Sequence, residues 1–497
     1  MGRMKDRRRN KKSIALFHLL FVFALLLGSC LPGIFACAAA RAKQAAPDAV
    51  PLRGVVEGFY GTPWTQQERL DMLSFCGRVG FNAYIYAPKD DAYHRSQWHL
   101  PYPPQKLTEL AALVKAAKAA RVRFIFAVSP GMDLFYRGHA GEEDQAAMLA
   151  KCEALYGVGV RDFAIFFDDI EQKDGPGQAA FLNAVAARLR ARHHDIGAVL
   201  TVPTEYFRAD MVDAAGVVKS YTASFSKLLS PDILVLYTGE GVVKGNLTAE
   251  EYQAAEGIYG RPLGIWWNYP VTDYKETNLA LGPVENLPLR GVPAVFFNPM
   301  RHEQMSRISL ATAASLANHP SHYEPQTAWQ EAIERQYGSL APAMMTVAEH
   351  AQHLETSWAD IGRSDAPALR QEMDALWQSY PRGVLLRLRV QRLDDRLAQI
   401  EMATEKLLLE LPGTQLAECR PQLLQLQRIV RADRLGLTLL AARRNGKMTA
   451  AQQTSFLAAR QAVIAHDGEA RISEKTARAF LDELTDHLGL VNETVGN

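Results

Sequence analysis

The sequence has almost no net charge, which excludes one large group of functions. It contains 55 basic and 54 acidic residues, so no net field attracts a polyanion. We therefore expect no nucleic-acid partner and favour a neutral or locally recognised substrate. Residues 47–497 otherwise have the mixed polar and apolar composition of a globular protein.

Cysteine is also scarce, and its positions exclude a disulfide framework. Cys30 and Cys37 lie in an N-terminal targeting segment, which leaves Cys76, Cys152 and Cys419 far apart in the chain. Neither these cysteines nor the 13 histidines show the short spacings of a metal site. Because a phosphate-binding loop is missing too, we expect neither a metal nor another cofactor.

Residues 1–46 are expected to direct export. The basic start MGRMKDRRRNKKS precedes a long apolar run at residues 14–27, as in a secretory signal peptide. LLGSC, ending at Cys30, resembles a bacterial lipoprotein processing site that would leave Cys30 lipidated. Ordinary cleavage near residues 38–40 and a membrane anchor are the alternatives. We expect a periplasmic, membrane-anchored or secreted protein, and the sequence leaves its oligomeric state open.

Residues 47–322 are expected to form a catalytic (β/α)8 barrel of the α/β class. Apolar and β-branched runs alternate with helical segments, which indicates a parallel sheet covered on both faces. The predicted strands are residues 53–61, 82–88, 122–130, 162–169, 197–206, 233–239, 262–270 and 294–299. Eight such units in succession predict a (β/α)8 barrel, with only a poor helix at 271–291. Thr65 with Glu68 has the spacing of a capping box at a helix start.

Residues 323–497 are expected to form an all-α helical bundle domain, because the strand pattern ends near residue 320 and does not return. Apolar residues follow alternating four- and three-residue steps between Leu386 and Leu411, which predicts one helix of an intramolecular bundle. Further bundle helices are predicted at 423–444 and 474–491.

Polar, aromatic and glycine residues follow every predicted barrel strand, where a (β/α)8 barrel carries its chemistry. Carboxylates, amides, a lysine and tryptophans without a phosphate loop are typical of a carbohydrate site. Asp168 and Asp169 are the strongest candidates, because two carboxylates directly after the buried run AIFF are costly without a function. Repulsion should make one of them hold its proton more tightly. They can share a pocket only if the strand breaks there, since neighbours on a strand point to opposite faces.

Five motifs carry a resemblance to a known family. RGVVEGFYGTPWT, NAYIYAPKDD, FAIFFDDI, PTEY and WWNYPVTDY, in order along residues 52–320, resemble those of glycoside hydrolase family 84, the β-N-acetylglucosaminidases that include O-GlcNAcase. The resemblance implies a substrate that is a glycan or glycoprotein containing N-acetylglucosamine. It also implies that terminal β-linked N-acetylglucosamine is removed with retention, through an oxazoline formed by the sugar's own acetamido group.

The resemblance further implies roles for individual residues. Asp168 would stay ionised and stabilise the acetamido group, Asp169 would be the general acid and then the base, and Tyr206 would donate to the acetamido oxygen. Repulsion from Asp168 would help to keep Asp169 protonated. The implied substrate-binding residues are Gly58, Lys89, Thr238, Trp266, Asn268, Asp273 and Asn298. Gly58 and Lys89 would bind one hydroxyl edge, Asp273 and Asn298 the O4 and O6 side, Asn268 the acetamido region, and Trp266 and Thr238 the acetyl methyl.

Simpler explanations compete with several of these roles. Lys89 could form a surface ion pair with Asp90 or Asp91, Asp273 could cap a turn, and Trp267 is expected to serve barrel packing. Glu171 and Glu205 receive no role. For the whole protein, the alternatives are a non-catalytic N-acetylglucosamine-binding protein, a scaffold acting through its bundle, and a hyaluronidase-like endo-acting enzyme. A groove for an acidic polymer should be basic, which disfavours the last.

Overall fold

The computed structural model describes residues 48–381, 383 and 385–490. The predicted signal peptide and the lipidation site at Cys30 lie outside this range. Within it, no helix is both long and apolar enough to cross a membrane. The described residues from Ala49 onward belong to one compact unit, and the predicted boundary between residues 322 and 323 stays a prediction.

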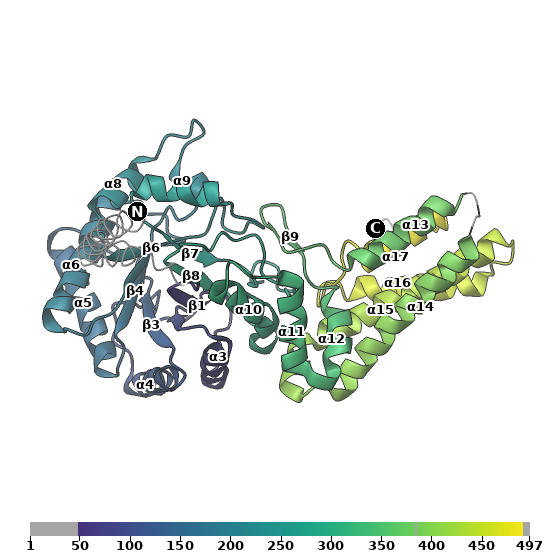
Figure 1. The fold of residues 1–497 in the computed structure, drawn as a ribbon, viewed down its shortest axis with the longest axis horizontal. Helices are drawn as coiled ribbons and strands as arrows, with labels where there is room; N and C mark the ends of the chain where they lie inside the picture. Colours follow the sequence, from purple (N-terminus) through teal and green to yellow (C-terminus); the bar gives the residue numbers. More distant parts are fainter. Residues whose placement is uncertain (1–47, 382, 384, 491–497) are drawn as a thin grey trace, which may run out of the picture. The chain divides into compact units, whose positions relative to one another are not determined.

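Eight parallel strands close into a barrel in sequence order (Figure 1). They are β1 Leu52–Glu57, β2 Ala83–Tyr86, β3 Arg123–Val128, β4 Asp162–Phe166, β5 Val199–Val202, β6 Ile233–Tyr237, β7 Gly264–Trp267 and β8 Ala294–Phe297. The β1–β8 pair closes the barrel, with Leu52 opposite Ala294. Seven strands lie within their predicted segments and β1 begins one residue before its segment, at Leu52, so the predicted (β/α)8 fold class is confirmed.

Alternation along each strand separates two apolar layers. Every strand contributes at least one residue to the cluster inside the barrel, among them Val56, Ile85, Ile125, Phe166, Leu200, Leu236, Trp266 and Phe296. Their neighbours along the strands, such as Val55 and Ile265, belong to the core between the strands and the surrounding helices. Beyond the end of each strand, the residues that continue this inward-facing alternation therefore point their side chains into the barrel mouth.

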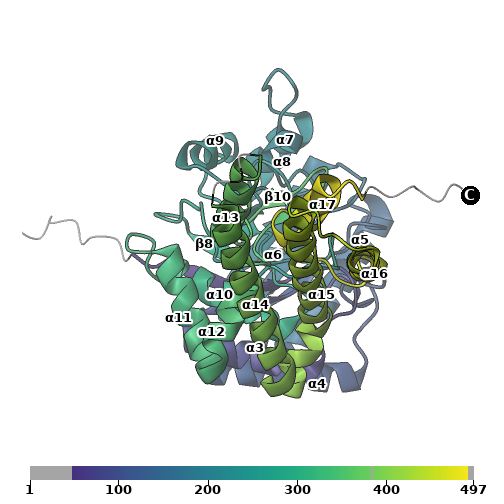
Figure 2. The same cartoon turned by 90° about the vertical axis from the view of Figure 1, so that its right-hand side faces the viewer.

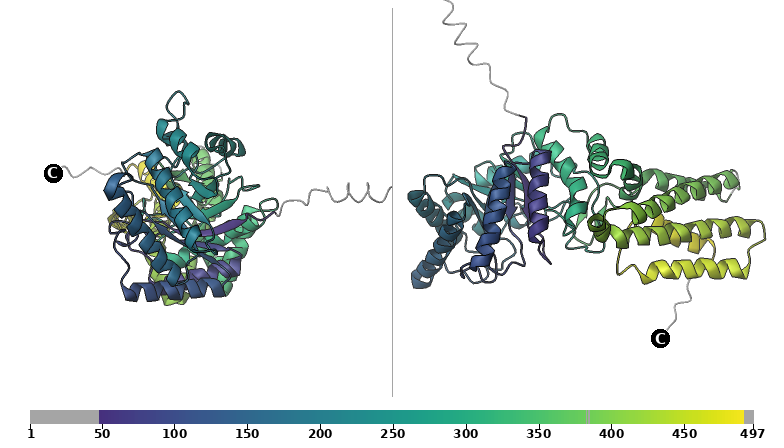
Figure 3. Two further views of the ribbon diagram at one scale, coloured as in Figure 1. Left: turned by 90° about the vertical axis from the view of Figure 1, so that its left-hand side faces the viewer. Right: turned by 90° about the horizontal axis from the view of Figure 1, so that it is seen from below.

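Helices surround the barrel (Figure 3). They are α3 Gln66–Val79, α4 Pro104–Ala119, α5 Gly138–Gly157, α6 Gly175–Arg192, α7 Arg208–Met211, α8 Ser220–Leu228, α9 Ala249–Tyr259 and α10 Glu303–Asn318. The capping box predicted at the start of α3 is present, because Thr65 Oγ1 accepts from Glu68 N and Glu68 Oε2 accepts from Thr65 N. Residues 271–291 contain no helix, in line with their high turn content.

The remaining helices form the C-terminal bundle (Figure 2). They are α11 Pro325–Tyr337, α12 Ala341–Ala348, α13 Pro367–Ser379, α14 Leu386–Glu410, α15 Gly413–Arg444, α16 Ala450–Ala465 and α17 Ala477–His487. The predicted apolar seam lies on α14, which packs along α15, while α15 also contacts α16 and α17. Several hydrogen bonds connect the bundle to the barrel; in one of them, Glu418 of α15 accepts from Met305 N at the start of α10.

One prediction about this region is wrong, because strands do return after residue 320. β9 Leu354–Glu355 and β10 Asp360–Ile361 form a small antiparallel hairpin. Two-residue strands are too short to leave a periodic pattern in the sequence, which explains why they were not predicted.

Candidate active site

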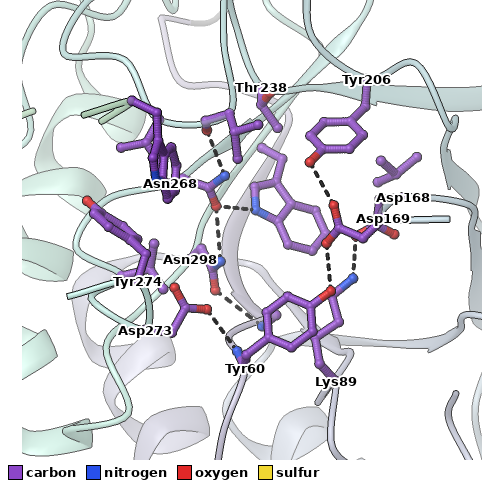
Figure 4. A pocket seen from close by; sticks show the side chains of 17 residues that line it. Tyr60, Lys89, Asp168, Asp169, Tyr206, Thr238, Asn268, Asp273, Tyr274 and Asn298 are labelled. Carbon is purple, nitrogen blue, oxygen red and sulfur yellow. Dashed lines mark hydrogen bonds and ion pairs between the residues drawn. The ribbon is translucent and has the colours of Figure 1, made fainter. Parts of the chain in front are cut away.

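A cavity of about 570 Å³ opens at the carboxyl ends of the barrel strands. It is lined by Gly58, Tyr60, Lys89, Asp168, Asp169, Val202, Tyr206, Thr238, Val242, Val243, Trp266, Asn268, Val271, Asp273, Tyr274, Asn298 and Trp358 (Figure 4). All ten site residues singled out from the sequence are therefore brought together in one pocket. They come from seven of the eight strands, either from the strand end itself or from the segment that follows it; β3 contributes none of them.

The two adjacent aspartates both reach this pocket because the backbone changes direction between them. β4 ends at Phe166, and Asp169 has a φ of 56°, in the left-handed region. Aspartate tolerates this conformation better than most residues, and such strained positions often lie at functional sites. The break in the extended chain removes the strict alternation that would otherwise place Asp168 and Asp169 on opposite faces.

Asp168 is a buried carboxylate with a buried counter-charge. Its Oδ2 forms an ion pair with Lys89 Nζ, and the two residues are 6% and 5% exposed. The other oxygen, Asp168 Oδ1, is buried and accepts no hydrogen bond. The surface ion pair considered for Lys89 is therefore wrong: Asp90 accepts from Gly61 N, and Asp91 accepts from the Tyr86 and Tyr102 hydroxyls.

Asp169 lies at the more exposed edge of the pocket between two phenols. Tyr60 donates to its Oδ2 at 2.7 Å, and Tyr206 donates to its Oδ1 at 2.8 Å (Figure 4). Partial burial raises the pKa of Asp169, but the charge of Lys89, both phenol hydrogen bonds and Arg95 outweigh it, so the pKa is lowered overall. Burial together with the Asp169 charge raises the pKa of both phenols, which keeps them protonated as donors.

The expectation that repulsion from Asp168 holds the Asp169 proton is therefore wrong for the unliganded pocket. Lys89 neutralises the neighbouring carboxylate, and hydrogen bonds to the ionised form of Asp169 favour that form. The Tyr206 hydroxyl, which the resemblance assigns to an acetamido oxygen, donates to Asp169 here.

The wall opposite the aspartates is a network of amides around an indole. Asn268 Oδ1 accepts from Trp266 Nε1 at 2.8 Å and from Asn298 Nδ2 at 3.0 Å, while Asn268 Nδ2 donates to Val242 O at 2.9 Å. Asn298 Oδ1 accepts from Gly58 N at 3.3 Å. These bonds fix the indole and both amides, so the wall is formed before any ligand enters.

Gly58 and Asp273 also line this pocket. A Cβ on Gly58 would lie 2.3 Å from Trp266 Cζ2, so only glycine allows this close approach. Asp273 Oδ2 accepts from Tyr60 N at 2.8 Å, and burial raises the pKa of Asp273. Thr238 is buried, and its hydroxyl donates to Gly241 O at 3.0 Å.

Three residues with no assigned role lie elsewhere. Trp267 packs in the core between strands and helices, as expected. Glu205 is buried, accepts from Lys173 and Thr222, and does not line the cavity. Glu171 is exposed. Among the described residues, no group of three or more His, Cys, Asp or Glu side chains is placed to hold a metal ion.

Sequence reasoning missed several pocket residues. Tyr60 lies inside a motif that was recognised, yet nothing local indicates that its hydroxyl reaches Asp169. Trp358 belongs to the turn between β9 and β10, is 48% exposed, and lies 5.0 Å from the Tyr274 ring between centroids. A residue beyond the barrel was not expected to line the cavity, and no sequence signal links Trp358 to it.

The fold and the site together indicate the class of protein to which this chain belongs. A (β/α)8 barrel whose mouth holds a carboxylate pair, amides and an indole, in a chain with almost no net charge, is typical of glycoside hydrolases. Residues 53–350 match the family model for beta-N-acetylglucosaminidase, and residues 368–481 match a family model described as hyaluronidase post-catalytic domain-like. The chain therefore belongs to the beta-N-acetylglucosaminidase family, glycoside hydrolase family 84, and the resemblance seen in its motifs is confirmed.

Individual relatives support this assignment. The Protein O-GlcNAcase of Rattus norvegicus and that of Mus musculus are each 30% identical over 274 residues, which is 53% of this chain and 30% of the relative. The chain thus matches less than a third of the length of these curated relatives. The structure of CpGH84B is similar with a TM-score of 0.80 at 34% identity, over 87% of this chain and 76% of that one. A mutant O-GlcNAc hydrolase of Thermobaculum terrenum has a TM-score of 0.77 at 26% identity, over 88% and 96%.

Proposed function

We propose that this protein is a retaining β-N-acetylglucosaminidase that removes terminal β-linked N-acetylglucosamine from a glycan or glycoprotein by substrate-assisted catalysis. The observation that supports this mechanism best is Asp168. It is buried, paired with Lys89, and has one oxygen without a donor. A buried acceptor of this kind is costly unless a ligand satisfies it. The N–H of a 2-acetamido group is a donor that meets this need.

In the first step the sugar supplies the nucleophile. The acetamido carbonyl oxygen forms a bond to the anomeric carbon while the glycosidic C–O bond breaks, and its electron pair stays on the leaving oxygen. Asp169 gives its proton to that oxygen. Asp168 accepts the acetamido N–H, and its negative charge stabilises the positive charge that develops as the oxazoline ring closes.

In the second step Asp169 acts as a base. Water adds to the anomeric carbon and gives a proton to the Asp169 carboxylate, while the oxazoline C–O bond breaks and the acetamido group is restored. Two successive inversions at the anomeric carbon retain its configuration. Positioned acid–base catalysis of this kind contributes about 10² to 10⁴ in rate.

Asp169 must gain a proton before the first step, because the unliganded pocket favours its ionised form. A bound sugar provides the means. If the Tyr206 hydroxyl donates to the acetamido oxygen instead of to Asp169, Asp169 loses one of its two phenol donors, and the sugar also excludes water from the carboxylate. Both changes raise the pKa of Asp169 in the complex.

Hydrolysis of an aryl β-N-acetylglucosaminide, followed by NMR, tests the proposal. We expect the β-anomer as the first product, no cleavage of the matched aryl β-glucoside, and tight inhibition by a thiazoline that mimics the oxazoline. An α-anomeric first product, or equal cleavage of the glucoside, would contradict the mechanism. Binding of the sugar without turnover would instead indicate a non-catalytic N-acetylglucosamine-binding protein.

A further inference from the structure

Tyr60 forms hydrogen bonds to both sides of the pocket. Its backbone N–H donates to Asp273 Oδ2 at 2.8 Å, and its hydroxyl donates to Asp169 Oδ2 at 2.7 Å. Asp273 is one of the residues expected to bind the sugar, and we call these residues the sugar-binding wall. Asp169 is the general acid of the proposed mechanism. The residue that follows β1 at the pocket edge therefore connects the sugar-binding wall to the proton donor.

Arg95, from the segment between β2 and α4, holds both partners of this hydrogen bond. Its Nη1 donates to the Tyr60 hydroxyl at 2.9 Å, and its Nη2 donates to the backbone carbonyl of Asp169 at 3.3 Å. The guanidinium carbon lies 5.3 Å from the centroid of the Tyr60 ring. Since the Asp169 backbone is in the left-handed region, a donor on its carbonyl helps to hold a conformation that is otherwise unfavourable.

We propose that Tyr60 and Arg95 are positioning residues that hold Asp169 for proton transfer to the leaving oxygen. This inference rests on the proposed function and deepens it. The two carboxylate oxygens then have different tasks. Oδ2 stays anchored by Tyr60, whereas Oδ1 becomes free when Tyr206 turns to the acetamido group, and it carries the proton given to the leaving oxygen and later taken from water.

The charges around Asp169 predict a second consequence. The charged and titratable groups that face it are Lys89 and Arg95 from the segment after β2, Tyr60 after β1, Tyr206 after β5, Asp273 after β7, and Asp168 beside it. Removal of the Tyr60 hydroxyl takes away one donor to the ionised form and leaves the others in place. The basic limb of kcat/KM, which follows Asp169 in the free enzyme, should therefore move to higher pH.

The experiment compares Tyr60→Phe with the full-length wild-type chain on aryl β-N-acetylglucosaminides of different leaving-group basicity. For phenyl glycosides, which need protonation, we expect kcat/KM to fall about tenfold or more; for dinitrophenyl glycosides we expect a change of about twofold or less. Arg95→Lys replaces the planar guanidinium with a single ammonium group, which cannot donate to both acceptors in the same geometry. This variant should therefore show the same selectivity. Tyr259→Phe is the matched control, because it removes a buried, unpartnered hydroxyl on α9 outside the cavity.

The outcomes separate this inference from the proposed function. Selective loss on phenyl glycosides together with a basic limb at higher pH in Tyr60→Phe supports the positioning role. Equal loss on both classes, or an unchanged pH profile, overturns it while the proposed function stands. A wild-type protein that cleaves none of the glycosides overturns both. Melting temperatures of the three variants identify a folding defect, and Arg95→Lys then decides the question if Tyr60→Phe is unfolded.

Discussion

Exchanging each aspartate of the pair for asparagine should have two different kinetic signatures. Asp168→Asn removes the charge that stabilises oxazoline formation, which is needed for every leaving group. Loss of one such electrostatic stabiliser costs about 10² to 10³ in rate. Asp169→Asn removes the acid, so kcat/KM should fall by about 10² to 10⁴ for phenyl glycosides and change little for dinitrophenyl glycosides.

The structure also predicts that the two substitutions lower the free energy of unfolding by different amounts. The side chains of Lys89 and Asp168 are 2% and 8% exposed, so Asp168→Asn leaves a buried ammonium without a counter-charge. Removal of one partner of a buried ion pair costs about 3 to 5 kcal/mol in the free energy of unfolding. Asp169 is exposed and loses only hydrogen bonds, at about 1 kcal/mol each. The double variant Asp168→Asn/Lys89→Met removes the unpaired charge and should recover much of the stability while kcat/KM stays low.

Urea unfolding and kcat/KM on the two classes of glycoside measure these effects. Enzyme concentrations must be corrected for the folded fraction, because Asp168→Asn is expected to be less stable. The assignment of roles would be refuted if Asp169→Asn lost activity equally on both classes, or if Asp168→Asn lost it only on phenyl glycosides. A stable Asp168→Asn variant would refute the importance of the buried ion pair.

Three further predictions concern other parts of the chain. Gly58→Ala places a Cβ 2.3 Å from Trp266 Cζ2, so we expect a loss of about 1 to 3 kcal/mol in stability and a raised KM, measured by urea unfolding and steady-state kinetics; a normal KM would contradict the tight approach. Thr65→Ala removes the cap of α3 and should cost about 1 kcal/mol with kcat/KM unchanged, whereas no shift in the urea midpoint would show that the cap contributes nothing. Burial raises the pKa of Asp365 to about 7, above that of an unfolded aspartate, so the folded state binds its proton more tightly. Stability from this group is then complete below about pH 4 and falls by about 4 kcal/mol as the pH rises to about 7; Asp365→Asn should flatten this part of the unfolding profile, and an unchanged slope would refute it.

The barrel could be predicted from local sequence because its strands and helices are set by short-range patterns. Each strand is an apolar, β-branched run that needs burial on both faces. The helix α3 begins at a capping box that spans only four residues, from Thr65 to Glu68. The site residues were found for the same reason: they follow strand ends, and parallel strands bring those ends to one side of the barrel. Family motifs then distinguished Asp168 and Asp169 from Glu171 and Glu205.

The remaining features depend on contacts between residues that are distant in the chain. Closure of the barrel brings Tyr60 and Arg95 to Asp169, and packing of the β9–β10 hairpin brings Trp358 to the cavity. The pKa of Asp169 follows from this arrangement, since Lys89 neutralises Asp168 and two phenols donate to the ionised acid. Local pattern thus specified the elements and the candidate residues, whereas the electrostatics of the pocket, which act through space, were set by the folded chain.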